Sequence, residues 1–209
     1  MDFYDVINSR RTIRDFTTEP IDMEIIKRVL SAGLKAPTHD HMRDWEFVVI
    51  TDRKKIASVL EKIPVNVSKE FVENIIKSWE LNDPCQQFGY RDAIPKQYEM
   101  LSKSACLILP FYKQKGDLFK LTKISSLNAF ASVWCCIENI FLAATAEGLA
   151  ATMRIPLDDE SSHIAEILKH PQDYIMPCYI ALGYAAPDAV VIPQNERNIK
   201  DKIHLNTWK

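Results

Sequence analysis

Apolar positions recur along the chain in two patterns, helical stripes and short runs. Positions 25, 26, 29 and 30 are apolar and follow Asp22, which predicts a helix that begins at this N-cap and reaches about Lys35. The short apolar run Trp45–Ile50 predicts a buried strand. By the same criteria we expect helices over residues 2–8, 52–63, 127–147 and 158–168, and strands over residues 105–111, 150–155 and 174–184.

The order of these elements indicates the fold class. The predicted helices outnumber the strands, and the strands are short and separated by helices, which favours an α+β or α/β sandwich with helices flanking a small mixed sheet. Only 5 of 209 residues are glycine, which argues against an all-β fold. The length fits one domain over residues 1–209. Within it, residues 64–103 have a mixed pattern, and we expect helices and loops that form a cover or lid.

Residues 127–146 are apolar over a length that could cross a bilayer. However, the stretch contains Asn128, Glu138 and Asn139, and a charge near the middle of a span costs about 3 kcal/mol on insertion scales. We therefore expect a helix buried in the domain core or in a subunit interface. Gly148 is expected to end it as the residue after the C-cap, and Asp158 or Asp159 to cap the helix that runs through Leu168.

Charge and cysteine content narrow the class further. The net charge is −2 with scattered basic residues, so the basic footprint of a nucleic-acid binder is lacking. The 5 cysteines include no C-x-x-C pair and are expected to be reduced core residues. The acidic N-terminus lacks the apolar region of a signal peptide. A cytoplasmic protein without membrane or nucleic-acid partners is expected.

Candidate chemistry begins at residues 9–16, which we call the arginine turn. Arg10, Arg11 and Arg14 lie within five residues, with the Thr12 hydroxyl among them. Guanidinium groups match phosphate oxygens bidentately and keep their charge, so the cluster suits a phosphate monoester. Taken alone, such a cluster is more often a solvated charged turn.

The polar loop 35–45 joins a predicted helix to the first predicted strand, and loops in this position often face ligands. His39 and His41 flank Asp40 there, and imidazole and carboxylate can both bind metals. A third His or Cys at ligand spacing is lacking, so we place contact with a ligand first, a surface loop second and a metal site third.

A third candidate region is 147–156, where the long helix ends at Gly148 and a short strand holds Arg154. Backbone groups at such a junction can approach a planar ligand closely, although an ordinary turn is the more frequent explanation. The chain has no G-x-G-x-x-G, P-loop or G-x-S-x-G motif, which removes the basis for Rossmann, NTPase and esterase functions.

Together these regions resemble the nitroreductase-like family of FMN-dependent oxidoreductases. The family opens with roughly S-R-R-S-x-R-x-F and continues, after a spacer with proline, to A-P-S-x-x-N-x-Q-P-W-x-F; here residues 9–16 read SRRTIRDF and residues 36–47 read APTHDHMRDWEF. The two motifs stand in order at the family's spacing. The resemblance is strong over 3–50, moderate from 105 to the end and absent over 64–103. The Ala-Pro-x-His sequence places the chain nearest a small-subunit branch.

The resemblance implies an FMN site between the subunits of an intertwined or domain-swapped homodimer. Arg10 and Thr12, with Arg11 beside them and Arg197 as a second ligand, would hold the FMN phosphate. Arg14 would reach the ribityl chain or the pyrimidine edge. The remaining cofactor contacts fall into two sets: Pro37, Thr38, His39, Lys35 and His41 toward the flavin held mainly by the other subunit, and Met153, Arg154 and Ile155 along its ring, with backbone groups near N5. No side chain is expected to act as catalytic nucleophile or base, and no metal is implied.

The implied activity is ping-pong hydride transfer from NAD(P)H, through flavin N5, to a nitro, quinone or similar small-molecule acceptor. The chain departs from the family pattern at His41, Arg43, Asp44 and Ala150, around the flavin and the substrate approach. Two alternatives therefore stay open: a non-catalytic FMN carrier or sensor, and a flavin enzyme of different chemistry, such as dehalogenation.

Overall fold

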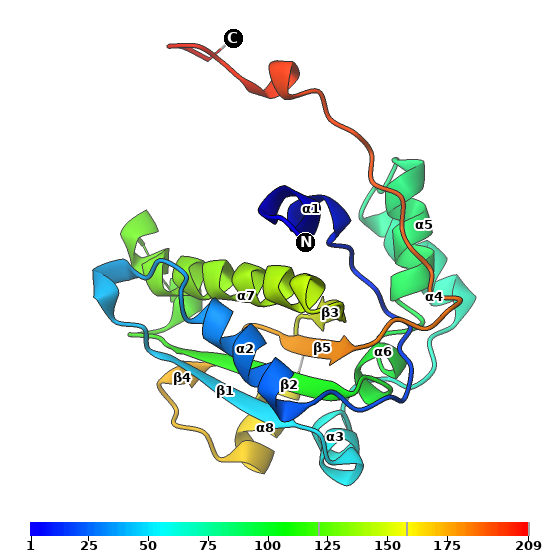
Figure 1. Cartoon of the computed structure of the whole chain (residues 1–209), viewed down its shortest axis with the longest axis vertical. Coiled ribbons are helices and arrows are strands. Elements are labelled where there is room, and N and C mark those ends of the chain that lie inside the picture. Colours follow the sequence, from blue (N-terminus) through cyan, green and yellow to red (C-terminus); the bar gives the residue numbers. More distant parts are fainter. Residues whose placement is uncertain (121, 158, 209) are drawn as a thin grey trace.

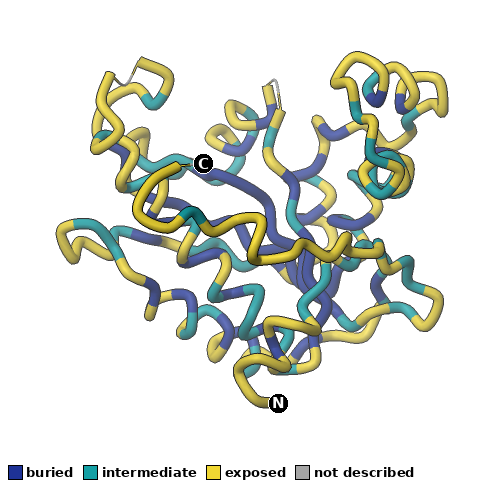
Figure 2. Tube along the Cα trace, turned by 90° about the horizontal axis from the view of Figure 1, so that it is seen from above, coloured by how far each residue is buried: buried dark blue, intermediate teal, exposed yellow. Residues whose placement is uncertain are grey.

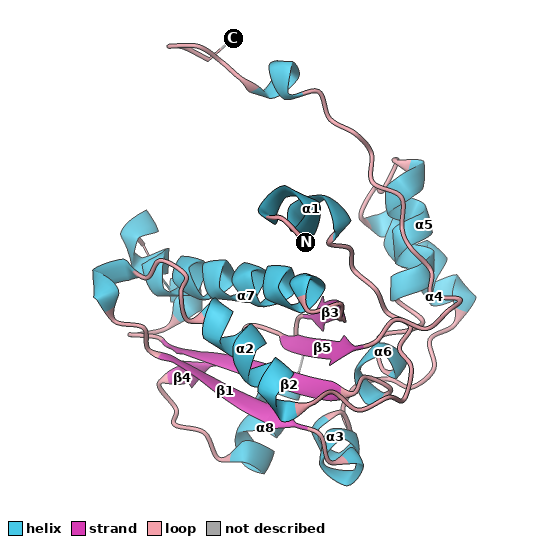
Figure 3. Ribbon diagram, viewed as in Figure 1, coloured by secondary structure: helices cyan, strands magenta, loops and turns pink. Residues whose placement is uncertain are grey.

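The computed structural model describes residues 1–120, 122–157 and 159–208, and a five-stranded sheet lies at its centre (Figure 3). Its main path runs β1-β2-β5-β3, and β4 pairs with β2. The strands are β1 (Trp45–Ile50), β2 (Cys106–Lys113), β3 (Ala150–Arg154), β4 (Tyr174–Ile175) and β5 (Tyr179–Gly183). The predicted strand over 45–50 is confirmed at both ends.

The strands pair antiparallel throughout these ladders, so the prediction of a mixed sheet is wrong for the ladders. The reason is the position of β5, which pairs with both β2 and β3 and separates these two strands of like direction. A parallel contact occurs instead at the single bridge between Thr12 and Ala151. It lays the arginine turn along the edge of β3.

Alternate residues of the central strands are buried in two different cores. On β2, Ile108 packs toward α2 (Met23–Gly33) and α7 (Asn128–Ala146), whereas Leu107 and Leu109 pack toward α3 (Arg53–Val59) and α8 (Glu160–Leu168). Successive side chains of a strand point to opposite faces, so a strand covered on both faces needs an apolar run. Figure 1 shows the resulting layers, with α2 and α7 above the sheet and α3 and α8 below it.

The packing of α2 on α7 requires a glycine. A Cβ atom at Gly33 would lie 2.8 Å from Cγ1 of Ile140 on α7, closer than non-bonded carbons approach. Asp22 caps α2 through a bond from the Glu24 amide, 2.9 Å long, as its sequence position predicts. Gly148 follows α7 with φ +75°, which confirms its expected place after the helix end.

Three predictions about the ends of elements need correction. The helix expected over 52–63 ends at Val59. The expected strand 174–184 is split into β4 and β5, because Pro177 has no N–H to donate to a ladder. Asp159 stands at the N-terminus of α8 without a side-chain capping bond, so this expected cap is wrong. Asp158, the other candidate, lies outside the described residues.

Residues 64–103 form helices, as expected: α4 (Lys69–Ser78), α5 (Pro84–Ala93) and α6 (Glu99–Ser102). The α4–α5 pair has a small core of its own around Val72, Ile76 and Ile94. The chain's end runs past α5 and then leaves the body (Figure 1). Figure 2 shows this tail in yellow, the colour of exposed residues.

In the described part of the chain, one helix, Ile124–Ala146, is long and apolar enough to cross a membrane by length and composition. Of the most apolar 18 residues of this helix, 33% are buried. The buried face of α7, including Val133, Ile137 and Ile140, packs into the core shared with α2 and the sheet. Phe130, Trp134 and Phe141 pack against the same core but are only half-buried.

Candidate functional site

The arginine turn is held in place by backbone and side-chain contacts at the sheet. Helix α1 (Phe3–Ser9) ends just before Arg10, and the Ile13 amide donates to the Ala151 carbonyl over 3.1 Å. Phe16 is buried against β5, where a Cβ at Gly183 would lie only 2.6 Å from its ring. Next to these anchors, Arg10, Arg11 and Thr12 line the space between β3 and α7.

Arg10, Arg11 and Thr12 line a cavity of about 250 Å³ together with Thr152 and Met153 of β3. The remaining lining residues come from α7 and β3, which face the arginine turn: Trp134, Ile137, Glu138 and Phe141 on α7, and Ala151 on β3. The structure therefore brings together the first and third regions selected from the sequence. The four α7 residues among them were not predicted, although their spacing places them on one side of a helix.

Some of the hydrogen-bond donors in this cavity have partners in the chain and others have none. Nη1 of Arg11 donates to the carbonyls of Asn8 and Arg10, each over 2.7 Å. Nε of Arg10 lies 3.6 Å from Oε1 of Glu138, while its terminal nitrogens and the Thr12 hydroxyl have no hydrogen-bond partner among the described residues. The cavity thus presents free donors of the kind that bind phosphate oxygens.

Arg14 lies beside the variable segment. Its Nη1 is 3.3 Å from Oδ2 of Asp92 on α5, and Oδ1 of the same carboxylate is 2.6 Å from Nζ of Lys96. Lys96 also contacts Oδ2 of Asp15 at 2.8 Å. Burial alone would raise the pKa of Asp15, but the Lys96 ammonium and the Val190 amide lower it below its usual value. These partners could not be predicted, because nothing in the sequence of 64–103 relates it to the arginine turn.

The side chain of Arg154 points away from the candidate site. Arg154 and Glu160 are 5% and 3% exposed and form a bidentate pair, with Nη2 to Oε1 at 2.6 Å. Nε of Arg154 donates to Gln97 Oε1 over 2.8 Å. Among the three residues expected along a flavin ring, Met153 lines the cavity, Ile155 is exposed, and Arg154 has only its backbone to offer.

The loop between α2 and β1 contains the short helix η1 (His39–His41) and an unusual backbone. Asp40, His41 and Arg43 have φ values of 50°, 53° and 51°, a left-handed conformation that costs energy in residues with a side chain. The His39 amide donates to the Ser132 hydroxyl on α7 over 3.1 Å. Such local strain persists where surrounding contacts enforce it, often at ligand sites.

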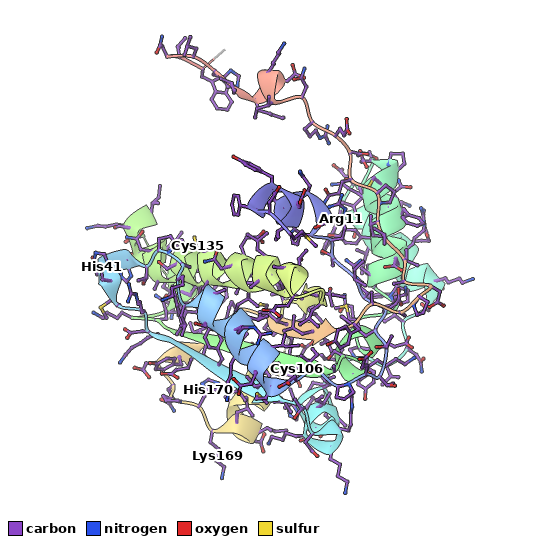
Figure 4. All side chains as sticks on the ribbon, in the orientation of Figure 1. Arg11, His41, Cys106, Cys135, Lys169 and His170 are labelled. Carbon is purple, nitrogen blue, oxygen red and sulfur yellow. The ribbon has the colours of Figure 1, made fainter. Side chains whose placement is uncertain are left out.

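Thr38 and His39 line a second cavity of about 230 Å³, which also contacts Ala129 and Ser132 near the start of α7. The first cavity instead contacts residues 134–141 of that helix. Figure 4 shows Arg11 and His41 toward opposite ends of α7. One chain therefore keeps the two sequence motifs apart. Within the described residues, no three His, Cys, Asp or Glu side chains gather as a metal-binding group.

Four other predicted site residues lie outside both cavities. Lys35 and His41 are exposed, and Pro37 is exposed beside the loop. Arg197 lies in the exposed tail and has no hydrogen bond or ion pair with any described residue. The structure of one chain does not bring Arg197 to the arginine turn.

Helices pack on both faces of a small antiparallel sheet, and a cationic cavity lies at its edge strand. The family match shows that the protein is of the class of FMN-dependent oxidoreductases. The chain belongs to the nitroreductase family, because the model described as "Nitroreductase family" matches residues 7–184.

Named relatives divide between two activities. Iodotyrosine deiodinase 1 of Mus musculus is 26% identical over 204 residues, which are 97% of this chain and 68% of that protein. A protein of Methanothermobacter thermautotrophicus named "Putative NADH dehydrogenase/NAD(P)H nitroreductase" is 27% identical over 217 residues, covering 100% of this chain and 88% of its own. A solved structure of iodotyrosine deiodinase with FMN and 3-iodo-L-tyrosine superposes with a TM-score of 0.70 at 19% identity, covering 98% and 99% of the two chains.

Proposed function

We propose that the protein is an FMN-containing reductase that takes hydride from NAD(P)H and passes it to a nitro, quinone or similar small-molecule acceptor. The observation that carries the proposal is the convergence of Arg10, Thr12 and Met153 on one cavity. Cationic and hydroxyl donors meet an edge strand there, as a ligand with a phosphate and a planar ring requires. Bound FMN would supply the redox chemistry, accepting and donating hydride at N5.

In this proposal, the protein's residues bind and tune rather than react. Arg10 and Thr12 bind the phosphate with donors that are free in the chain itself, and Arg11 adds positive charge. The guanidinium of Arg14 lies near the pyrimidine edge of the flavin. Reduction of the flavin develops negative charge there, which a fixed positive charge stabilises. The strand around Met153 and Ile155 offers backbone groups to the ring.

We further propose that two copies complete each site. Helix α1, with Phe3 and Tyr4 exposed, packs on α7, whose aromatic residues are only half-buried. Exposed apolar side chains of this kind often mark subunit interfaces. Covering them with a second copy would let Pro37, Thr38, His39, His41 and Lys35 of one subunit approach the cavity of the other. The tail could then bring Arg197 to a phosphate. Residues 64–103 would cover the site.

An anaerobic reduction experiment tests the proposed activity. Purified protein is expected to contain FMN, and NADH or NADPH should bleach its absorbance, with colour restored by nitro or quinone acceptors. Arg10→Ala combined with Thr12→Ala should abolish FMN retention, whereas Arg91→Ala, which removes a paired arginine on α5, should retain it. Tight FMN in the double variant refutes the phosphate assignment. FMN that no nicotinamide bleaches would favour a carrier or sensor.

Reductive dehalogenation is the second candidate. It is favoured by the 97% of this chain that aligns with mouse iodotyrosine deiodinase 1. Release of iodide from 3-iodotyrosine by the reduced protein, at a rate exceeding its reduction of nitro compounds, would select this activity over the first.

A further inference from the structure

Segment 64–103 brings a carboxylate to the arginine turn, and the proposed phosphate site makes no use of it. Nη1 of Arg14 donates to Oδ2 of Asp92 on α5 over 3.3 Å, and both side chains are largely buried. The two residues stand 78 positions apart in the sequence. The resemblance to the family is absent over this segment, so the role of Asp92 has to be inferred from its contacts.

Asp92 is held mainly by a different partner. Its Oδ1 lies 2.6 Å from Nζ of Lys96, four residues further along the chain, and Lys96 also contacts Oδ2 of Asp15 at 2.8 Å. The bond to Arg14 is the longer of the two contacts of Asp92. Arg14 can therefore interact with a ligand without leaving the buried carboxylate uncompensated, which would be costly.

Arg14 keeps most of its donors for a ligand. Within the part of the chain that the structure describes, its guanidinium makes this one hydrogen bond, although a guanidinium has five N–H donors. The fully buried side-chain atoms that lack a partner among those residues do not include any nitrogen of Arg14, so its free donors are accessible. Asp92 thus fixes one end of the guanidinium and leaves the remainder open.

The same contacts also cancel charge. Arg14 and Lys96 are cations and Asp15 and Asp92 are anions, so the four side chains together are neutral. A carboxylate beside the guanidinium offsets part of the positive potential that Arg14 alone would exert on its surroundings. In the proposed function, the flavin gains negative charge beside Arg14 when it is reduced, so Asp92 opposes the stabilisation of the reduced form.

We propose that Asp92 is a positioning residue: it holds Arg14 in place and, through its charge, weakens the preference of the protein for reduced over oxidised FMN. The inference rests on the proposed function, in which Arg14 lies at the pyrimidine edge. It assigns to segment 64–103 a part in setting the reduction potential of the flavin, since charges near the ring tune its electronic properties. A lower potential makes the reduced flavin a stronger donor to the acceptor.

Midpoint potentials of the FMN-loaded protein, measured anaerobically against a reference dye, test the inference. Asp92→Asn keeps an oxygen acceptor for Arg14 and removes the charge. Reduced FMN should then bind at least about threefold more tightly, relative to oxidised FMN, than in the wild type, because a unit charge acts more strongly in partly buried surroundings than in water. Threefold corresponds to a rise of about 14 mV, at about 30 mV per tenfold for a two-electron couple.

Lys96→Gln removes a positive charge from the same four side chains and should shift the potential in the opposite direction, downward. A general loosening of the segment cannot produce both shifts, and Lys96→Gln tests the inference independently if Asp92→Asn does not fold. Asp92→Glu keeps the charge and should restore most of the wild-type potential. Glu73→Gln is the matched control, because it removes an equal charge from α4, where Glu73 pairs with Arg91, and should leave the potential unchanged.

An unchanged or lower potential in Asp92→Asn overturns the inference, as does a shift in Asp92→Glu as large as that in Asp92→Asn. Either result in a protein that binds FMN rejects this inference alone and leaves the proposed function standing. A wild-type protein that binds no FMN rejects the proposed function and this inference together.

Discussion

Nη1 of Arg14 lies 3.3 Å from Oδ2 of Asp92, and the two side chains are only 17% and 8% exposed. The contact joins the arginine turn to α5, across 78 residues of sequence. Lys96 extends the pair to Asp15. The segment 64–103 is therefore attached by charge to the turn for which we propose phosphate binding.

The Asp15–Lys96 contact predicts a pH dependence of stability. Burial opposes both charges, but their mutual contact lowers the pKa of Asp15 and raises that of Lys96. The Asp15 contribution is present above its unfolded pKa of about 3.9 and is lost as pH falls through the lower folded value. The Lys96 contribution is present below its unfolded pKa of about 10.4 and is lost as pH rises through the higher folded value.

Asp15→Asn should thus destabilise the protein by about 1–2 kcal/mol at neutral pH, with the difference disappearing in acid below about pH 4. Urea unfolding at a series of pH values measures it. Glu24→Gln, which breaks the exposed pair with Lys27, should have little effect at any pH. A loss for Asp15→Asn that is constant with pH would contradict this assignment.

The buried Arg154–Glu160 pair predicts a strong asymmetry between single and double variants. Arg154→Met leaves the 3% exposed Glu160 without its partner, at a cost of about 3–5 kcal/mol. Combining it with Glu160→Leu removes the uncompensated charge and should regain most of the free energy of unfolding. Denaturant unfolding of both variants is decisive, and a double variant as unstable as the single one would disprove the coupling.

The position of Glu138 beside Arg10 predicts that removing its charge tightens FMN binding. Its carboxylate, 3.6 Å from Arg10, competes with a phosphate and repels it. Removing one charge at about 4 Å in water is worth about 1 kcal/mol, so Glu138→Gln should strengthen FMN binding about fivefold. Titration of the apoprotein by flavin fluorescence measures this. Glu46→Gln on β1 changes the net charge equally, and an equal gain there would remove Glu138 from the site.

The thiol reactivity of two neighbouring cysteines shows whether a second copy covers the exposed side of α7. Cys135 is exposed in one chain, whereas Cys136 is buried and burial raises its pKa to about 12. If a second copy covers α7, a thiol reagent should modify neither of them in the native Cys85→Ser protein. Conditions that separate the subunits should add one reactive thiol, Cys135. Rapid reaction of Cys135 in the native protein would contradict a covered helix.

The sequence predicted those elements in which local signals and tertiary burial agree. Asp22 precedes an amphipathic stripe and caps α2, and Trp45–Ile50 forms a strand with the predicted ends. Pro177 by itself indicates a break in a strand, but the apolar residues on both sides of it led to the prediction of one continuous strand. The expected cap at Asp159 failed because the residue adopts a non-extended backbone, with φ −86° and ψ 1°, in which no capping bond forms.

The candidate site was less predictable, because its partners come from distant segments. Arg154 looked available from its place on a short strand, yet Glu160 on the next helix pairs with it in the core. Glu138 was visible only as a charge in an apolar helix, and its contact with Arg10 depends on how α1 packs over α7.

Sedimentation velocity of the untreated protein, recorded at the protein and the flavin absorbance together, tests most directly that two copies build an FMN site. The account predicts a single boundary of two chains that carries flavin at one FMN per chain. A colourless boundary of single chains would contradict it.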